Sequence, residues 1–392
     1  MVSRLEEDLD SRFFQIVRGH LIDAHVNIAD TFDVQRGLSK DELFFGENVK
    51  SLDYLFSAIA LAVSSKNSAG LIHPVIATPS TGLNSVYDFL QSRLVHYSKQ
   101  EPAVKFSAID CKSLIGQTRL GDDDEKIEIP RLIKWRMENE ETNLGTKLFL
   151  LNNASAIVSS NGLTFKEVIS EMKSISETAS FVAFLSPSAY QYVSSNLTEE
   201  DELPFSRPIL FDGFSVTDLK AFKKIIEDRL KRESSLSGIS IDDVGLEVAL
   251  VSSRGVPYYA FKIISESIKS ALFDDTKNVT ASRITQIKNE MMLDSMWQNI
   301  DELTEGQIAI LTALTSFPEN SATVYQIRDK LRSFRKPVGD RSAILQQLRK
   351  LYQNNLLDRE KPSNSLQVFY KLRQTVSPAF EERVKNTLKS VR

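Results

Sequence analysis

Cysteine is almost absent from this sequence of 392 residues, and histidine is scarce. The single cysteine, Cys111, excludes an internal disulfide and predicts a reducing compartment. It ends the apolar run 104–111, where we expect a buried structural thiol rather than a nucleophile. The histidines lack the spacing of metal ligands, so we expect no metal site at any of them: His20, His25, His73 and His96.

Long hydrophobic runs are missing as well. The longest apolar stretch, residues 54–63, is about half of the ~20 residues that a membrane-spanning helix needs. Charged side chains begin within the first few residues, so we expect no secretory signal. These absences predict a protein that makes no membrane contact.

The charge of the chain is unevenly distributed. Lysine and arginine number 48 against 52 aspartate and glutamate, a net charge of −4. Residues 321–392 contain 16 basic and 6 acidic residues, so this segment carries +10 and the remainder −14. A basic end on an acidic protein is typical of nucleic-acid binding, although a well-solvated surface would show the same excess. With 42% hydrophobic and 26% charged residues, we expect a globular protein of two or three domains.

Apolar strands alternate with helical patterns in the first half of the chain. Strands are predicted at 73–77, 103–111, 147–158, 180–190 and 207–214, and helices from Leu83 onward, at 129–141 and at 165–175. Nearly continuous apolar strands separated by helices are typical of a parallel sheet that is covered on both faces. The predicted fold class is therefore α/β.

The second half has two further patterns. Residues 215–298 are predicted to be helical, with a first helix that opens on the capping pair Ser215 and Asp218. Helices at 304–317, 323–334 and 340–355 then precede two basic strands within 356–373, which predicts a winged helix-turn-helix. The apolar stripe of a last helix, 377–391, is expected to pack on that winged helix or to pair with a second copy of the chain.

The turn after the first strand looks like a phosphate-binding loop that has lost its chemistry. Such a loop needs G-x-x-x-x-G-K-[ST] between strand and helix, so that backbone amides and a lysine surround the phosphates. In this chain the four diagnostic positions are Ala77, Gly82, Leu83 and Asn84. Leucine cannot neutralise a phosphate, and asparagine is a poor substitute for the hydroxyl that binds magnesium.

The order of these parts resembles the AAA+ ATPases of the origin-recognition initiator group and their archaeal ATPase relatives. Those proteins join a P-loop-NTPase-like α/β core, a helical lid and a C-terminal winged helix. Glu42 to Gly46 match the ELFFG segment of the family, although Glu47 and Asn48 follow where Arg-Glu is usual. Residues 214–230 resemble its first lid helix. The resemblance implies an AAA+-like core at 1–214, a lid at 215–298 and a winged helix at 299–392.

The resemblance also implies where further nucleotide-site residues should be, and most of these positions differ from the family. Asn152 and Asn153 stand at the positions of the two strand-end acids, and Tyr258 stands near that of the lid arginine. Ser186 or Ser188 would be the polar sensor, and Arg207 lies near the arginine that the family aims at a neighbouring subunit. Neutral amides neither hold magnesium well nor act as a base. We therefore expect no ATP hydrolysis and no required cofactor, while weak, passive nucleotide binding stays open.

The helix predicted at 340–355 separates apolar from polar side chains on a helical wheel, and its apolar side is expected to hold Ile344, Leu345, Leu348, Leu351 and Tyr352. Its polar side presents groups that are able to read base edges or neutralise phosphates, namely Ser342, Gln346, Gln347, Arg349 and Lys350. The strands that follow add Arg359, Lys361, Lys371 and Arg373. These residues predict binding of double-stranded DNA, whereas the alternative is a winged helix that binds protein.

The sequence leaves three functions open. The leading hypothesis is a catalytically inactive AAA+-like DNA-binding protein that acts in replication initiation, chromosome organisation or transcription control, in the cytoplasm with the nucleoid or in a eukaryotic nucleus. The second is a scaffold or adaptor that pairs with an active AAA+ partner or with a second copy. The third is a signalling ATPase relative that keeps nucleotide only as a structural ligand. Salt-dependent DNA binding would separate the first two.

Overall fold

The computed structural model describes residues 42, 46–64, 71–100, 106–113, 148–158, 169–170, 180–196, 205–233, 236, 238–333, 340–362 and 367–390. They form two compact units. One unit holds Gly213–Ser295 together with the described residues up to Gly46, and the other holds the described residues of Glu47–Asp212 and Met296–Arg392. The predicted core and the predicted winged helix thus lie in one unit, while the three-domain division stays a prediction.

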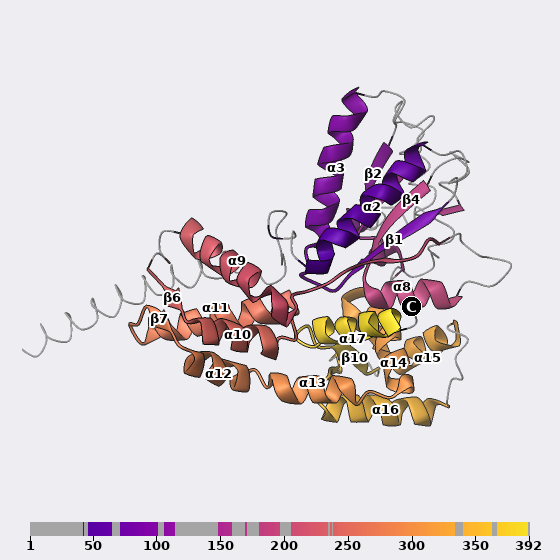
Figure 1. Cartoon of the computed structure of the whole chain (residues 1–392). Helices are drawn as coiled ribbons and strands as arrows, with labels where there is room; N and C mark the ends of the chain where they lie inside the picture. Colours follow the sequence, from indigo (N-terminus) through magenta and orange to yellow (C-terminus); the bar gives the residue numbers. More distant parts are fainter. Residues whose placement is uncertain are drawn as a thin grey trace, which may run out of the picture. The chain divides into compact units, whose positions relative to one another are not determined.

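A five-stranded parallel sheet is the centre of the second unit (Figure 1). Its strands are β1 (Ile72–Ala77), β2 (Phe106–Asp110), β3 (Leu148–Asn152), β4 (Ser180–Leu185) and β5 (Ile209–Phe211), in the order β2-β3-β4-β1-β5. Every pairing is parallel, and β1 lies between β4 and β5, with Val75 opposite both Phe184 and Ile209. The predicted parallel α/β core is confirmed.

Apolar burial explains why these strands form. Every residue of β1 and β4 is buried, and aromatic rings join neighbouring strands, with Phe149 and Phe181 stacked at 5.4 Å between ring centroids. Helices α2 (Gly46–Ser64), α3 (Leu83–Gln100), α6 (Ser155–Val158) and α8 (Pro187–Asn196) belong to the same unit. Cys111 is buried, as expected, and burial raises the pKa of its thiol, which favours the protonated form.

The strands β2 to β5 are shorter than the sequence predicted: β2 covers 106–110 of the expected 103–111, β5 covers 209–211 of the expected 207–214, and β3 and β4 differ most. The strand expected at 147–158 ends at Asn152, and residues 155–158 form α6 instead; Asn153, at φ 51°, is the point where the extended backbone stops. The strand expected at 180–190 ends at Leu185, because Pro187 begins α8. The helix predicted at 129–141 lies outside the described residues, as does all but 169–170 of the one at 165–175.

The first unit is mainly helical. It contains η4 (Val216–Asp218), α9 (Leu219–Arg232), α10 (Asp243–Ser252), α11 (Pro257–Phe273), α12 (Ala281–Glu290) and the start of α13 (Leu293–Asp301). The Asp218 carboxylate accepts a hydrogen bond from the Ser215 amide at 2.7 Å, as the capping pattern predicted. Two strands too short for a sequence pattern, β6 (Ser240–Ile241) and β7 (Asn278–Val279), pair in parallel within this unit.

Gly255 allows two segments of this helical unit to touch. It has φ +74°, and its carbonyl accepts a hydrogen bond from the Phe214 amide at 2.8 Å. A Cβ at this position would lie 1.6 Å from the Phe214 carbonyl oxygen, so only glycine fits. The contact fixes the chain just before α9.

The C-terminal segment joins four α-helices, among its described residues, and a small sheet. Its elements are α14 (Glu305–Thr315), η6 (Pro318–Asn320), β8 (Ser321–Thr323), α15 (Val324–Ser333), α16 (Arg341–Gln353), β9 (Leu357–Glu360), β10 (Phe369–Leu372) and α17 (Ser377–Ser390). The strands pair antiparallel in the order β8-β10-β9. The predicted helices and both predicted strands are present, and Asp340 caps α16 by accepting from the Ala343 amide at 2.8 Å. The three-residue β8 was missed.

The last helix, α17, packs on the helix that follows the fourth core strand. Its neighbour is α8, and Figure 1 shows the two side by side. Phe380 and Val384 of its apolar stripe are buried. The contact with α8 shows that α17 packs on the α/β core of its own chain, a partner that the sequence did not predict, while pairing with a second copy stays a prediction. Among the described helices, none is long and apolar enough to cross a membrane.

Candidate functional site

The loop between β1 and α3 closes on itself instead of opening around a ligand. The Thr78 carbonyl oxygen accepts hydrogen bonds from both the amide and the Oγ1 of Thr81, at 3.2 and 2.5 Å. Ser80 and Gly82 take positive φ values of 69° and 82°, which gives a tight turn. Leu83, in the place of the lysine, begins α3 and carries no charge. One amide that a phosphate-binding loop would offer is therefore used within the turn.

This closed loop contains a buried hydroxyl without a partner. Thr78 is 1% exposed, and its Oγ1 forms no hydrogen bond with the described part of the chain. Asn84, at the position of the magnesium-binding hydroxyl, is exposed on the first turn of α3. Ala77 is buried at the end of β1. The four diagnostic positions thus supply neither a cation nor a hydroxyl to a ligand.

The two asparagines that replace the strand-end acids lie at the end of β3, beside Asp110 at the end of β2. The Asn153 Nδ2 donates to Asp110 Oδ1 at 3.0 Å, and the Asn152 Oδ1 accepts from the Asn153 amide at 2.9 Å. Sequence reasoning missed Asp110, although an acid that directly follows an apolar strand is a visible signal. No group of three or more His, Cys, Asp or Glu residues suited to a metal occurs in the described ranges. Asp110 thus accepts a hydrogen bond from the Asn153 side-chain amide.

The sensor candidate Ser188 is occupied by α17. Its amide and its Oγ donate to the two carboxylate oxygens of Glu381, at 2.8 and 2.5 Å. Ser188 is the second residue of α8, so the Glu381 carboxylate caps the positive end of that helix. Burial raises the pKa of Glu381 to about 7, although both hydrogen bonds from Ser188 act to lower it. The other candidate, Ser186, donates its amide to Ser155 Oγ at 2.7 Å.

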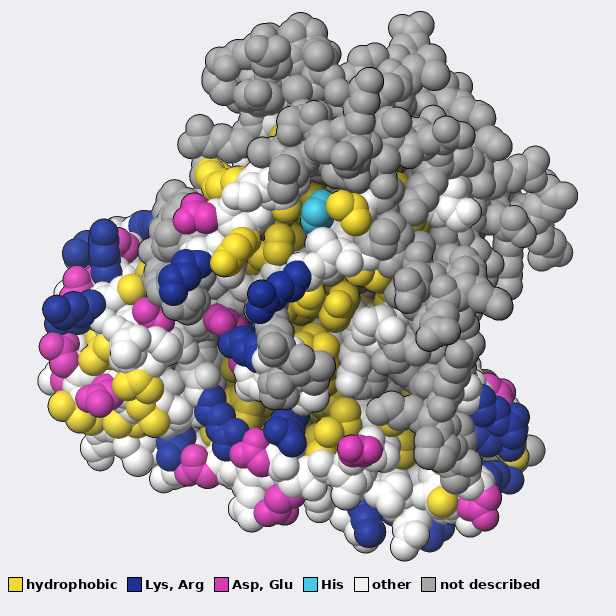
Figure 2. Space-filling view, turned by 45° about the vertical axis from the view of Figure 1, so that its right-hand side comes forward, with side chains coloured by type: hydrophobic (Ala, Val, Ile, Leu, Met, Phe, Trp, Pro, Cys, Tyr) yellow, Lys and Arg dark blue, Asp and Glu magenta, His cyan; other side chains and the backbone are white. Residues whose placement is uncertain are grey.

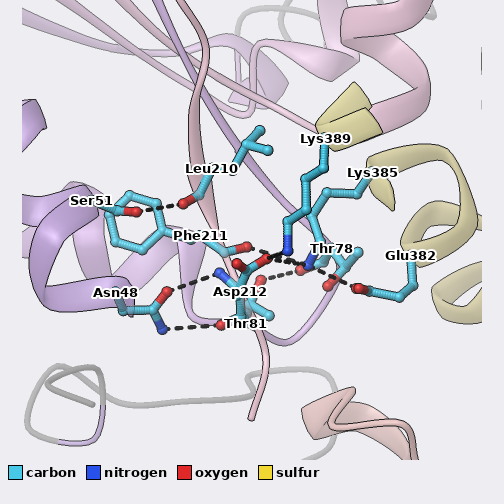
Figure 3. Close-up of polar contacts among 10 residues, drawn as sticks. All are labelled: Asn48, Ser51, Thr78, Thr81, Leu210, Phe211, Asp212, Glu382, Lys385 and Lys389. Carbon is cyan, nitrogen blue, oxygen red and sulfur yellow. Dashed lines mark hydrogen bonds and ion pairs between the residues drawn. The ribbon is translucent and has the colours of Figure 1, made fainter. Parts of the chain in front are cut away.

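A second contact fastens α17 to the end of β5 (Figure 3). The Lys385 side chain is fully buried, and its Nζ lies 3.1 Å from Asp212 Oδ1 and 2.8 Å from Glu382 Oε2. Lys389 also reaches Asp212, at 2.7 Å. Burial alone would raise the pKa of Asp212, but the two lysines hold it below its usual value. Burial likewise opposes the charge on Lys385, yet Glu382 and Asp212 raise its pKa.

Asn48 holds the backbone of Asp212 from the other side. Its Nδ2 donates to the Asp212 carbonyl at 3.0 Å, and its Oδ1 accepts from the Asp212 amide at 2.8 Å. Ser51, one turn later in α2, donates to the Leu210 carbonyl at 2.6 Å. Asn48 is one of the two residues that depart from the family pattern after the ELFFG segment. In this chain its amide serves to fix the end of β5.

The two remaining positions implied by the resemblance are simple surface or packing residues. Arg207 is exposed shortly before β5. Tyr258, in place of the lid arginine, is half-buried near the start of α11 and packs edge-on against Tyr259 at 5.1 Å between centroids. Neither forms an ion pair within the described residues. The strand ends at which a nucleotide site is implied thus form hydrogen bonds within the chain, and the residues that follow β4 and β5 contact α17.

The polar face predicted for α16 is confirmed as a face of exposed side chains. Ile344, Leu348 and Leu351 are buried, while Gln346, Arg349 and Lys350 are exposed on the other side. Three other positions differ from the expectation. Gln347 is only partly exposed, Ser342 is exposed but donates to the Asp340 carboxylate at 2.7 Å, and Tyr352, expected on the apolar side, is 46% exposed.

The four predicted basic residues of the hairpin divide into two pairs. Arg373 Nε lies 2.9 Å from Asp358 Oδ1, and Lys371 Nζ lies 3.2 Å from Glu319 Oε2. Arg359 and Lys361 are exposed and form no ion pair with the described chain. Figure 2 shows basic and acidic side chains interspersed over one face of the molecule. A cationic surface therefore has to be identified from the basic side chains that form no ion pair with a described acidic residue, and not from the overall charge.

Comparisons with known proteins give structural neighbours only. No family model matches the chain, and no curated protein matches it in sequence. The structure is similar to the Aeropyrum pernix ORC2 protein in its ADP form, at 12% identity and a TM-score of 0.47, over 93% of this chain and 98% of that one. It is also similar to the Aeropyrum pernix ORC1 protein in complex with DNA, at 12% identity and a TM-score of 0.46, over 90% and 96%.

A third neighbour is the Thermotoga maritima RuvB Holliday junction branch migration motor, at 15% identity and a TM-score of 0.37, over 87% of this chain and 96% of that one.

Proposed function

We propose that this protein is an AAA+-initiator-like DNA-binding protein that does not hydrolyse ATP. The observation that carries the proposal is the exposed face of α16, on which Arg349 and Lys350 have no acidic partner in the described structure. The winged-helix assignment supports it, because α16 would be the helix that enters the major groove.

The charge pattern around α16 suits a polyanion. Residues 341–353 contain no acidic residue. Strand β9 packs against α16 and brings Arg359 beside it, and the exposed Lys361 follows directly. A basic side chain without an acidic partner contributes its full charge to phosphate binding. Lys371 and Arg373 are already partly neutralised by the carboxylates of Glu319 and Asp358. We therefore assign phosphate contacts to Arg349, Lys350, Arg359 and Lys361, and base contacts to Gln346 and Gln347.

Binding of duplex DNA by the full chain should fall steeply with salt. Each lost phosphate contact reduces the slope of log affinity against log salt by about 0.9. Arg349→Ala, Lys350→Ala and Lys361→Ala should each weaken binding and flatten that slope, measured by fluorescence anisotropy over a salt series. Gln346→Ala should change sequence preference and leave the slope nearly intact.

Two substitutions serve as controls for this series. Lys220→Ala removes an exposed lysine of the helical unit and should leave both affinity and slope unchanged. Arg373→Ala should have a smaller effect than Arg349→Ala, because Asp358 already neutralises Arg373. If the folded full chain binds no duplex even at low salt, the proposal fails, and the adaptor that pairs with a protein partner becomes the better hypothesis.

Magnesium-dependent ATP hydrolysis by the purified protein should not exceed background. The reason is that Leu83, Asn84, Asn152 and Asn153 replace the lysine, the hydroxyl and the two acids on which phosphoryl transfer depends. Phosphate release is the measurement, with a no-protein blank as reference. A turnover that disappears when Thr81 and Gly82 are replaced would assign it to this loop and contradict the proposal.

A further inference from the structure

A cavity lies between α16 and the two strands β9 and β10 of the C-terminal segment. Its volume is about 360 Å³, and its walls come from the first turn of α15, the outer face of α16 and the strands β9 and β10. This volume is within the usual range of small-molecule sites. Arginines and tyrosines contribute six of its lining residues, namely Tyr325, Arg341, Arg349, Tyr352, Arg359 and Tyr370.

The cavity is strongly cationic. Arg341, Arg349 and Arg359 line it, and no acidic residue is among its lining residues. None of the three arginines forms an ion pair with a carboxylate of the described chain, in contrast to Arg373, which lies 2.9 Å from Asp358. The first turn of α15 adds the positive end of a helix dipole. Arginine guanidinium groups favour phosphate, because their donors match its oxygens in pairs.

The cavity also offers aromatic surface. Tyr325 and Tyr352 are 43% and 46% exposed, and Tyr370 is buried at 5%. The Arg341 guanidinium lies 4.7 Å from the centroid of the Tyr325 ring. Exposed tyrosines on a folded surface provide flat platforms on which a nucleobase can stack. An anionic group and a planar group can therefore be held within one cavity.

We propose that this cavity binds one unpaired nucleotide of DNA, with the base against Tyr352 or Tyr325 and the phosphate among the three arginines. The inference rests on the proposed DNA binding and deepens it. A base within a duplex is stacked on both of its faces and paired along one edge, so it cannot enter the cavity. The protein should then prefer DNA that contains an unpaired nucleotide over the same DNA fully paired.

The test compares two labelled duplexes of about twenty base pairs, which are identical except for one unpaired thymidine at the centre of the first. Anisotropy titrations of the full chain should give roughly tenfold tighter binding of the bulged duplex, in the range that stacking of one base on an aromatic ring supplies. Tyr352→Ala should remove much of this preference, and Tyr352→Phe should keep it. Lys350→Ala, a neighbour on α16 outside the cavity, should weaken both duplexes alike.

Photo-crosslinking locates the base directly. With 5-iododeoxyuridine at the unpaired position, irradiation should join the DNA to Tyr325 or Tyr352, as identified by mass spectrometry. Crosslinks exclusively to residues outside the cavity would overturn the inference, as would equal affinity for the two duplexes, and both results would leave DNA binding itself intact. Failure of both duplexes to bind would instead overturn the proposed function, and this inference with it.

Discussion

Arg229→Ala should destabilise the protein by about 3–5 kcal/mol, the usual cost of removing one partner of a buried ion pair. Arg229 Nε and Nη2 donate to the two oxygens of Glu42 at 2.9 and 2.5 Å, and both side chains are at most 7% exposed. The guanidinium also lies 4.0 Å from the centroid of the Phe261 ring. Without Arg229, the buried Glu42 carboxylate would lose both of these charge-assisted hydrogen bonds. Urea denaturation followed by circular dichroism measures the loss.

Paired substitutions separate charge from packing in this experiment. The double variant Glu42→Leu with Arg229→Met should recover most of the lost stability, because two apolar side chains leave no buried charge. Lys223→Ala, which removes the exposed partner of Asp243, is the matched control and should change little. A loss in Arg229→Ala no larger than in Lys223→Ala would show that the Glu42 pair contributes nothing.

Lys385→Ala should release α17 from the α/β core and cost about 3 kcal/mol or more. The amine is fully buried, with Asp212 and Glu382 as its ion-pair partners. Its removal takes away the described ion pair of Glu382 and leaves Asp212 paired with Lys389 among the described residues. Urea denaturation measures the stability, and hydrogen exchange of the α17 amides measures the release. Exchange should accelerate along α17 and much less in β1 and β4, which are buried throughout.

The control for this second prediction is the neighbouring lysine. Lys389 contacts the same carboxylate but is 39% exposed, so Lys389→Ala should have a small effect. Lys385→Met keeps the apolar stem and should fall between wild type and Lys385→Ala. If Lys385→Ala and Lys389→Ala destabilised the protein equally, burial of Lys385 would not be the reason for its importance.

The amino-acid pattern by itself determined the local elements and their class. Apolar runs such as the one ending at Ala77 predict buried strands, and their alternation with helices predicts a parallel sheet, because both depend on neighbouring residues. The caps at Ser215 and Asp340 mark helix starts through a bond to a residue three positions away. The buried and exposed faces of α16 follow from the period of the helix for the same reason.

Only the tertiary structure decided which distant residues meet. Lys385 and Glu381 read as ordinary solvated charges of an amphipathic helix, yet they contact Asp212 and Ser188, more than 170 positions earlier in the chain. The apolar stripe of α17 shows that it packs, but α8 is selected by long-range packing that no local pattern encodes. The same holds for Arg229, whose partner Glu42 lies 187 residues away, and for the cavity beside α16, which exists only where helix and hairpin are brought together.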